Sequence, residues 1–347
     1  MSSPEPSARA DAIGKWLESR LQGSGPVSVG KMRKPGSGLS AGTFFVDATR
    51  GAETHHLVVR VPPAAGEGVF PNSDLGRELR FQQLLREGGV PVADVVGMEL
   101  DPTVLGGPFV VTRKVNGRLV DSSDPYMSSG WLHDESPEYQ QTLASDFFGV
   151  LGTMHSLAVT DEIIESLKPL DEVDASTELR RSVKRWGRYL DWADNGIAPD
   201  SLRSALDWCR GNQPDDRAKP SLLWGDSQLA NAVFAEDGSV AALLDFELAG
   251  VGQAELDLGW FLCLHDMTAA RCGQDLPGFS NREALLAGYE ERLGREIVDL
   301  RWYEIFGAVC TASILLRMAS IFSRGGTDMS WLAKKNPALD YLAEKLA

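Results

Sequence analysis

Strand-like sequence is confined to two parts of this chain, and this feature constrains the fold more than any other. Residues 25–115 contain short apolar runs such as GTFFVDA and HHLVVRV, together with one helix-like stretch, DLGRELRFQQLLREGG. After 116–118 (NGR) helical periodicity dominates, and only 221–245 is strand-like again. Short apolar runs separated by turn residues predict antiparallel strands. The pattern therefore predicts an α+β fold with two lobes, a small antiparallel-sheet lobe and a large, mostly helical lobe.

The predicted organisation divides the chain into three parts. Apolar residues recur at helical spacing between Asp11 and Leu21, just before the helix-stopping GSGP, which indicates an N-terminal helix. The three parts are residues 1–24, 25–115 and 116–347, the last with a hairpin at 221–247. The predicted helices lie near 138–157, 177–193, 200–210, 281–293 and 298–323. The turn-rich segment 120–137 is predicted to be a mobile loop.

Composition excludes some classes of function. A net charge of -15 and a pI near 4.8 argue against nucleic-acid binding, because no basic stripe is available to neutralise phosphates. The apolar run from Ile305 to Leu316 is too short to span a bilayer and is closed by Arg317, so it predicts a buried helix and no membrane partner. The four cysteines show no CxxC spacing, and the N-terminus lacks the apolar core of a signal peptide, which predicts a cytoplasmic location.

Two features of the small lobe suit phosphate binding. The glycine-rich segment PGSGLSAGTFFVDA leads directly into a strand, and the backbone N–H groups of such a hairpin can close over phosphates. An ordinary hairpin turn is the alternative. Arg60 ends the next apolar strand, and Glu78 lies on the helix that follows. A strand cation steadied by a helical carboxylate binds nucleotide phosphates in kinases, whereas the alternative is an exposed arginine at a strand edge.

The segments SLLWGDSQLANAVF and ALLDFELAG contain the most specific pattern. Asp226 and Asn231 have the D-x-x-x-x-N spacing of a kinase catalytic loop, and Asp245 ends the next apolar run. In that chemistry an aspartate accepts the proton of an attacking hydroxyl, while an asparagine and a second aspartate hold Mg²⁺. We expect a hairpin to bring positions 231 and 245 to one end. Two surface acids beside turns would not predict the glycine loop, basic residue and glutamate found upstream.

With these motifs, and with LGTMHSL and ELDLGWFL in the same order, the chain resembles the aminoglycoside phosphotransferase/choline kinase superfamily from about residue 25 onward. The resemblance implies a protein-kinase-like fold, ATP or GTP as phosphoryl donor, Mg²⁺ as cofactor and a hydroxyl of a small molecule as acceptor. It implies Asp226 as the catalytic residue and Asn231 and Asp245 as metal ligands. The implied nucleotide-binding residues are Gly38, Ser40, Arg60, Glu78 and, in the hinge from Val111 to Val115, Thr112, Arg113, Lys114 and Val115.

The chain departs from the family pattern at two informative positions. Trp224 stands where a histidine commonly precedes the catalytic aspartate by two residues. Since an indole can pack and donate one hydrogen bond, we expect the loop to keep its structure. Arg60 replaces the usual lysine, a feature similar to the kinase-like domains fused to acyl-CoA dehydrogenases. His155 and Asp257 lie in family segments, and we expect both to be structural supports.

The sequence leaves the activity and the acceptor open. A nucleotide-binding pseudokinase and an interaction scaffold are the alternatives to a phosphotransferase. The acceptor is an aminoglycoside, amino alcohol, sugar, hydroxyacyl compound or macrolide, and the oligomeric state is not defined. Acidic residues either line a cationic-ligand site or lie on solvated helix faces, which we favour: Asp191, Asp194, Asp266 and Glu290. Aromatic residues either shape a pocket or fill the core, which we favour for most: Trp186, Tyr189, Trp192, Trp260, Trp302 and Tyr303.

Overall fold

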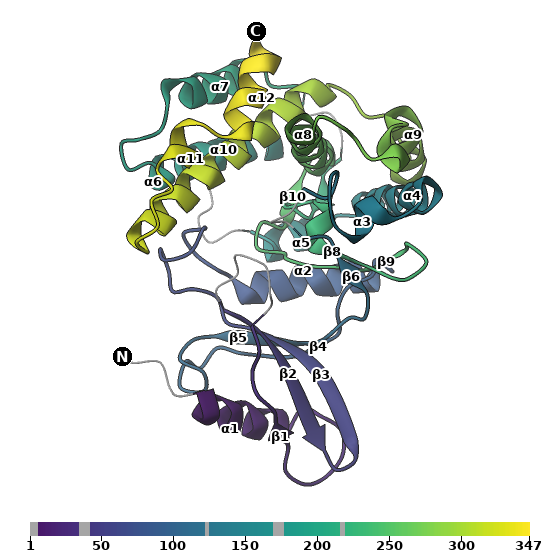
Figure 1. Ribbon diagram of the computed structural model, residues 1–347, viewed down its shortest axis with the longest axis vertical. Coiled ribbons are helices and arrows are strands. Elements are labelled where there is room, and N and C mark those ends of the chain that lie inside the picture. Colours follow the sequence, from purple (N-terminus) through teal and green to yellow (C-terminus); the bar gives the residue numbers. More distant parts are fainter. Residues whose placement is uncertain (1–5, 35–41, 122–124, 169–176, 216–218) are drawn as a thin grey trace.

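A computed structural model describes residues 6–34, 42–121, 125–168, 177–215 and 219–347. The chain forms two lobes, with a small sheet lobe below a larger helical lobe in Figure 1. This arrangement confirms the predicted α+β fold with an antiparallel-sheet lobe and a mostly helical lobe.

The small lobe is built on one five-stranded sheet of order β1-β2-β3-β5-β4. Its strands are β1 (Ser28–Val29), β2 (Thr43–Arg50), β3 (Glu53–Arg60), β4 (Val95–Glu99) and β5 (Phe109–Arg113). The predicted hairpin is confirmed, because β2 and β3 pair antiparallel from Thr43 opposite Arg60. A side chain at Gly42 would collide with the carbonyl of Val61, so glycine is required where the chain enters β2.

The N-terminal helix α1 (Pro6–Leu17) belongs to the small lobe. Ile13 and Leu17 are fully buried in the same apolar cluster as residues of β2, β3 and β5. The Trp16 ring meets Phe109 edge-on at 5.0 Å, and its indole N–H donates to Glu99 at 2.9 Å. The predicted N-terminal helix therefore packs on the sheet of the small lobe.

Helix α2 (Leu75–Glu87) lies between the sheet and the helical lobe (Figure 1). Asp74 caps it by accepting a hydrogen bond from the backbone N–H of Arg77 at 3.0 Å. Phe81 is fully buried and packs 5.5 Å from the ring of Phe246. The helix therefore carries Glu78 to the junction of the two lobes.

The helical lobe contains the predicted helices as α4 (Pro137–Ser156), α6 (Glu178–Ala193), α7 (Asp200–Gly211), α9 (Arg282–Leu293) and α10 (Leu300–Arg324). It also contains α3 (Trp131–Asp134), α5 (Asp161–Ser166), α8 (Glu255–Cys272), α11 (Trp331–Lys334), α12 (Pro337–Leu346) and two short 3₁₀ turns, Leu229–Asn231 and Pro277–Phe279. The sequence reading missed α8. Ten of its residues are buried, so it lacks the one-sided apolar stripe by which helices are predicted.

Helix α10 is long and apolar enough to cross a membrane by length and composition alone. The run from Ile305 to Leu316 is only part of this helix, which has 25 residues. The length of the run alone therefore did not exclude a membrane span. However, 61% of its most apolar window is buried inside the fold, as in a core helix. Its residue Arg317 is also buried and donates to the carbonyls of Gly66 and Gly68, at 2.5 Å and 3.0 Å.

The single hairpin predicted at 221–247 is divided between two small sheets. Strand β7 (Ser221–Leu223) pairs with β10 (Gly250–Gly252). Strand β8 (Ala232–Phe234) forms the hairpin with β9 (Val240–Leu243) and also pairs with β6 (Arg118–Leu119). The loop between β7 and β8 thus connects two sheets, and the positions just before β8 and just after β9 do lie together.

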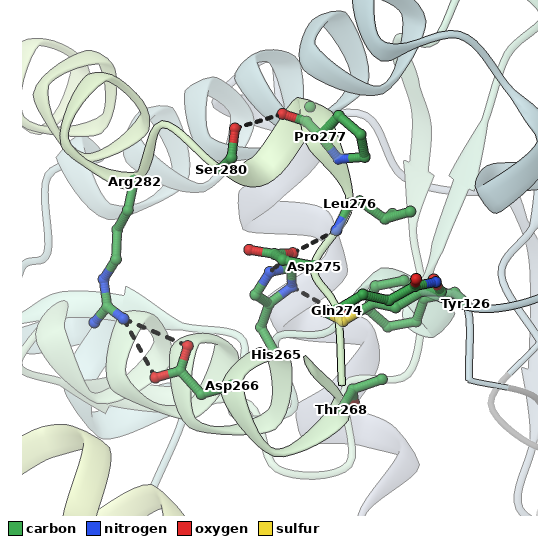
Figure 2. A network of polar contacts seen from close by, with 12 residues as sticks. Tyr126, His265, Asp266, Thr268, Gln274, Asp275, Leu276, Pro277, Ser280 and Arg282 are labelled. Carbon is green, nitrogen blue, oxygen red and sulfur yellow. Dashed lines mark hydrogen bonds and ion pairs between the residues drawn. The ribbon is translucent and has the colours of Figure 1, made fainter. Parts of the chain in front are cut away.

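Residues 125–137, which belong to the segment 120–137 predicted as a mobile loop, are anchored on α8 and on the residues that follow it. Tyr126 is hydrogen-bonded to His265 at 2.9 Å, and His265 is hydrogen-bonded to Asp275 at 3.0 Å (Figure 2). Gln274 donates to the carbonyl of Met127 at 2.5 Å, and the Met127 side chain is fully buried. The segment also contains the short helix α3, and these hydrogen bonds and the burial of Met127 hold it against the helical lobe.

Candidate active site

The loop after β7 holds the Asp226 carboxylate in one orientation. Gln228 donates to both of its oxygens at 2.8 Å, and the amide of Asn231 donates to Oδ2 at 2.8 Å. The indole N–H of Trp260, on α8, donates to Oδ1 at 3.0 Å. Three donors around one carboxylate leave it little rotational freedom, as a residue that aligns a reacting group requires.

Burial and a neighbouring charge alter the acidity of Asp226. Burial, followed by the negative charge of Asp245, raises the pKa of Asp226 to about 6, and the hydrogen bonds from Gln228, Asn231 and Trp260 oppose this shift. A carboxyl group with a pKa near 6 is a better proton acceptor at neutral pH than an ordinary aspartate.

Asp257 holds the start of the same loop through hydrogen bonds to its backbone. It is 1% exposed and accepts hydrogen bonds from the backbone N–H groups of Trp224 and Gly225 at 2.6 and 2.7 Å. His155 is hydrogen-bonded to Asp257 at 3.0 Å and to Tyr289 at 2.7 Å. The expectation that His155 and Asp257 are structural supports agrees with these buried contacts.

Trp224 also stabilises the loop, through packing and one hydrogen bond. Its side chain is fully buried and packs against Phe147, with ring centroids 6.2 Å apart. Its indole N–H donates to the carbonyl oxygen of Leu244 at 2.7 Å, one residue before Asp245. The indole thus packs and donates a hydrogen bond at once, which explains how the loop keeps its structure without a histidine.

Asn231 and Asp245 offer oxygen ligands suited to Mg²⁺. Asn231 uses its amide nitrogen on Asp226, which leaves its Oδ1 as an acceptor, and its backbone carbonyl accepts from Leu244 at 2.8 Å. Asp245 has a left-handed backbone with φ of 60°, and within the described chain its carboxylate has no hydrogen-bond partner. No cluster of three or more His, Cys, Asp or Glu forms a metal site in the described residues. Mg²⁺ is commonly bound by one or two protein groups plus phosphates and water, so this donor set fits it.

Arg60 connects both lobes at the site. It forms ion pairs with Glu78 of α2 and, at 3.0 Å, with Glu247 two residues beyond Asp245. Burial and the charge of Asp245 raise the pKa of Glu247, while Arg60 opposes that shift. A guanidinium can donate to two carboxylates through separate N–H groups whose directions are fixed. The donors of a lysine ammonium are less precisely oriented. The Oε1 atom of Glu78 is buried and has no hydrogen-bond partner among the described residues.

A cavity of about 450 Å³ lies between the lobes and collects most of the residues predicted to bind nucleotide. It is lined by Arg60, Glu78, Thr112, Arg113, Lys114, Val115, Asn231 and Asp245, among others. Arg113 and Lys114 donate their backbone N–H groups to Asp94 and His56. Among the hydrogen bonds of the described residues, the backbone N–H of Val115 has no partner. Gly38 and Ser40 lie outside the described residues.

A second cavity of about 310 Å³ borders the loop after β7. Gly225, Asp257 and Trp260 form its wall next to Asp226, and Phe70 and Pro71 of the β3–α2 connection contribute to it from the small lobe. Helix α6 supplies a further wall with Arg188, Tyr189 and Trp192, among others. Neighbours of Asp226 line both cavities: Asn231 and Asp245 line the first, and Gly225 and Trp260 line the second.

Sequence reasoning missed the contacts of Gln228 and Trp260 with Asp226. Trp260 was grouped with aromatic residues of unassigned role, although it lies in the ELDLGWFL segment that carries the family resemblance. Trp186, Tyr189 and Trp192 also line the second cavity, whereas the indole of Trp302 donates to the core carbonyl of Cys209 at 3.1 Å. The sequence signal for the Trp260 contact was its position in this family segment, three residues after Asp257.

Comparison with known proteins agrees with this geometry. The sequence pattern of the phosphotransferase enzyme family matches residues 31–301. Acyl-CoA dehydrogenase family member 11 of Homo sapiens is 28% identical over 228 residues, which are 65% of this chain and 27% of that protein. Its counterpart in Mus musculus is 30% identical over 226 residues, covering 64% of this chain and 26% of that protein. The chain thus spans about a quarter of these relatives.

Solved structures show the same fold. A candidate aminoglycoside phosphotransferase from Ralstonia eutropha JMP134 has a TM-score of 0.69 at 22% identity, covering 96% of this chain and 98% of that chain. Choline kinase LicA from Streptococcus pneumoniae has a TM-score of 0.60 at 14% identity, covering 96% and 97%. Aminoglycoside phosphotransferase APH(4)-Ia, crystallised with AMP-PNP and hygromycin B, has a TM-score of 0.58 at 13% identity, covering 97% and 99%.

The fold and the site define a kinase-like protein with two lobes. The chain belongs to the phosphotransferase enzyme family, whose pattern covers most of its length. The predicted resemblance to aminoglycoside phosphotransferases, choline kinases and the kinase-like parts of acyl-CoA dehydrogenase family proteins is confirmed.

Proposed function

We propose that this protein is an ATP- and Mg²⁺-dependent kinase that transfers the γ-phosphoryl group to a hydroxyl of a small molecule. The observation that carries the proposal is the Asp226 carboxylate, which three donors hold in place. Its neighbour Gly225 lines the second cavity, and Asn231 and Asp245 line the first. Crystals of structural neighbours with AMP-PNP or GDP support a nucleoside phosphate as the donor. ATP is our choice over GTP, and the cytoplasm is the proposed location.

The residues have separate tasks in this mechanism. The backbone N–H of Val115 offers a hydrogen bond to the base in the inter-lobe cavity, and Arg60, positioned by Glu78, supplies positive charge to the phosphates. Asp226 accepts the proton of the acceptor hydroxyl from the second cavity and keeps its oxygen in line with the phosphoryl group. Precise placement of the two reactants accounts for most of the catalysis in phosphoryl transfer.

Mg²⁺ would be held by Asn231 Oδ1 and the Asp245 carboxylate, and when bound it neutralises charge on the phosphates. Both ligands have defined backbone positions, since the Leu244 N–H donates to the Asn231 carbonyl. The Trp224 indole holds the Leu244 carbonyl. These two contacts keep the ligand-bearing segments together without using the oxygen atoms that a metal requires.

The proposal is tested by ADP release from ATP and Mg²⁺ across a panel of hydroxyl compounds, with Asp226→Ala as the inactive variant. We expect turnover with at least one acceptor and a loss of at least a thousandfold in Asp226→Ala, with nucleotide affinity nearly unchanged. ATP binding with no turnover by the parent protein across the panel would instead establish the pseudokinase alternative. The absence of any thermal stabilisation by nucleotides would favour the interaction scaffold.

A further inference from the structure

The charged residues of the second cavity do not suit a cationic acceptor. Its described lining contains three arginines, Arg77, Arg185 and Arg188, and two carboxylates, Glu247 and Asp257. This excess of positive charge stands out in a chain with a net charge of -15. The described lining thus contains one more cationic than anionic side chain, although the chain as a whole is acidic.

Both carboxylates of the described lining already have strong partners. Glu247 forms an ion pair with Arg60 at 3.0 Å. Asp257 accepts two backbone hydrogen bonds from the catalytic loop and a third contact from His155. An ammonium group bound here would have to share Glu247 with Arg60, or Asp257 with the loop after β7.

The acidic residues considered from the sequence as cation ligands do not line this cavity. Asp191 and Asp194 form ion pairs with Arg203, and Asp266 forms one with Arg282. Glu290 accepts from the backbone N–H of Ile297 at 2.8 Å. Their role on helix surfaces and in local networks agrees with the expectation that we favoured.

Aromatic side chains form a large part of the remaining lining. Trp186 and Trp260 lie with ring centroids 5.8 Å apart, and Trp186 meets Tyr189 edge-on at 5.0 Å. Phe70 from the small lobe lies 5.7 Å from Tyr189. Trp260 links this wall to the reaction centre through its hydrogen bond to Asp226. Aromatic walls favour an acceptor with a largely apolar body, because its burial removes apolar surface from water.

Arg188 provides a cation at the edge of this aromatic wall. It lies on the same helix as Arg185 and Trp192, at spacings of three and four residues that share a helix face. Arg188 is exposed and has no carboxylate partner among the described residues. An exposed guanidinium beside an apolar cavity can bind the anionic end of a ligand whose body enters the cavity.

Building on the proposed kinase function, we infer that the acceptor is an alcohol with a largely apolar body and an anionic group, a carboxylate or a phosphate, which Arg188 binds. The hydroxyl lies at the Asp226 end of the cavity and the anion lies at the α6 end. This class differs from the polycationic aminoglycosides that the names of several structural neighbours indicate.

The test uses four probes, each a benzene ring with a hydroxymethyl group and a different group in the para position. They are 4-(hydroxymethyl)benzoate, 4-(hydroxymethyl)phenyl phosphate, 4-(hydroxymethyl)benzylamine and 4-(hydroxymethyl)benzamide. Binding to the full chain is measured by titration in the presence of AMP-PNP and Mg²⁺. We expect at least one anionic probe to bind about fivefold more tightly than the amine, and the tighter of the two anions identifies the group. Arg188→Gln should weaken that anion about fivefold and change the neutral amide by less than twofold.

Arg271→Gln is the matched control, because Arg271 is also exposed and lies in the last turn of α8, away from the cavity. It should leave the affinities of all four probes unchanged. The inference is overturned if the amine or kanamycin binds as tightly as the anions, if no probe binds, or if Arg188→Gln affects all probes equally. Turnover is measured separately: probes that bind but are never phosphorylated would contradict the kinase proposal alone, whereas phosphorylation of cationic acceptors only would contradict the acceptor class alone.

Discussion

The indole N–H of Trp260 donates a hydrogen bond to Oδ1 of Asp226 at 3.0 Å. Trp260 lines the second cavity, which is the proposed site of the acceptor and is called the acceptor cavity below. The contact joins α8 to the catalytic loop across 34 positions of sequence. It makes the placement and the acidity of the carboxylate depend on a side chain that also shapes the acceptor cavity.

Replacing Trp260 by phenylalanine tests this dependence. The ring remains, but the donor is lost, and a hydrogen bond to a charged group contributes about 1.5–3 kcal/mol. We expect kcat to fall at least tenfold. Because this hydrogen bond lowers the pKa of Asp226, its loss should raise that pKa and move the acid limb of the kcat/KM profile to higher pH. Trp302→Phe is the control, since its indole donates to Cys209 in the core; it should reduce stability without moving the acid limb.

Asp226→Asn should separate activity from stability. The pKa of Asp226 is raised to about 6 in the folded protein, so its contribution to stability is present below about pH 4 and is lost as pH rises through 6. The asparagine variant does not undergo this loss. We expect the stability of the asparagine variant relative to the parent to increase by about 1–2 kcal/mol between pH 5 and pH 8, while phosphoryl transfer is abolished.

Urea unfolding of both proteins at pH 5 and pH 8 measures this difference. The control is Asp237→Asn, because a hydrogen bond from Ser239 lowers the pKa of Asp237 and gives the opposite pH dependence. A parent protein whose stability relative to Asp226→Asn stays constant between the two pH values would contradict the raised pKa.

Trp224 should influence metal binding without touching the metal. Trp224→Phe leaves the Leu244 carbonyl without its indole donor, and an unsatisfied buried polar group costs about 1–3 kcal/mol. We expect lower thermal stability and a several-fold higher Mg²⁺ concentration for half-maximal activity, because the backbone next to Asp245 is no longer held. Trp224→His restores a hydrogen-bond donor. It should bring the Mg²⁺ concentration for half-maximal activity back toward that of the parent, and restore less of the thermal stability. Equal Mg²⁺ dependence in all three proteins would show that the indole only fills space.

Arg317 should act on the acceptor and not on the nucleotide. Its guanidinium donates to the carbonyls of Gly66 and Gly68 and lies 4.1 Å from the ring centroid of Trp192. These contacts hold the connection that carries Phe70 over the acceptor cavity. We expect Arg317→Lys to raise the KM of the acceptor about fivefold and to leave the KM of ATP within twofold. A parallel rise in both constants would indicate a general loss of lobe packing.

The sequence by itself determined the elements whose signals are local. The β2–β3 hairpin follows from two short apolar runs separated by turn-forming residues, and it was predicted correctly. The spacing of Asp226 and Asn231, with Asp245 at the end of the next strand, predicted that these positions lie together, because one loop and one short hairpin connect them. Such relationships need only a few residues of chain geometry to be inferred.

Tertiary structure decided the parts of the site that come from distant segments. Helix α8 escaped prediction because it is buried on most sides and has no amphipathic stripe, so the contacts of Asp257 and Trp260 with the catalytic loop were not foreseen. The pairing of Arg60 with Glu247 joins residues 187 positions apart. The acceptor cavity likewise combines α6, α8, α10 and the β3–α2 connection. Its shape and charge depend on packing over long distances, which a local pattern in the sequence does not encode.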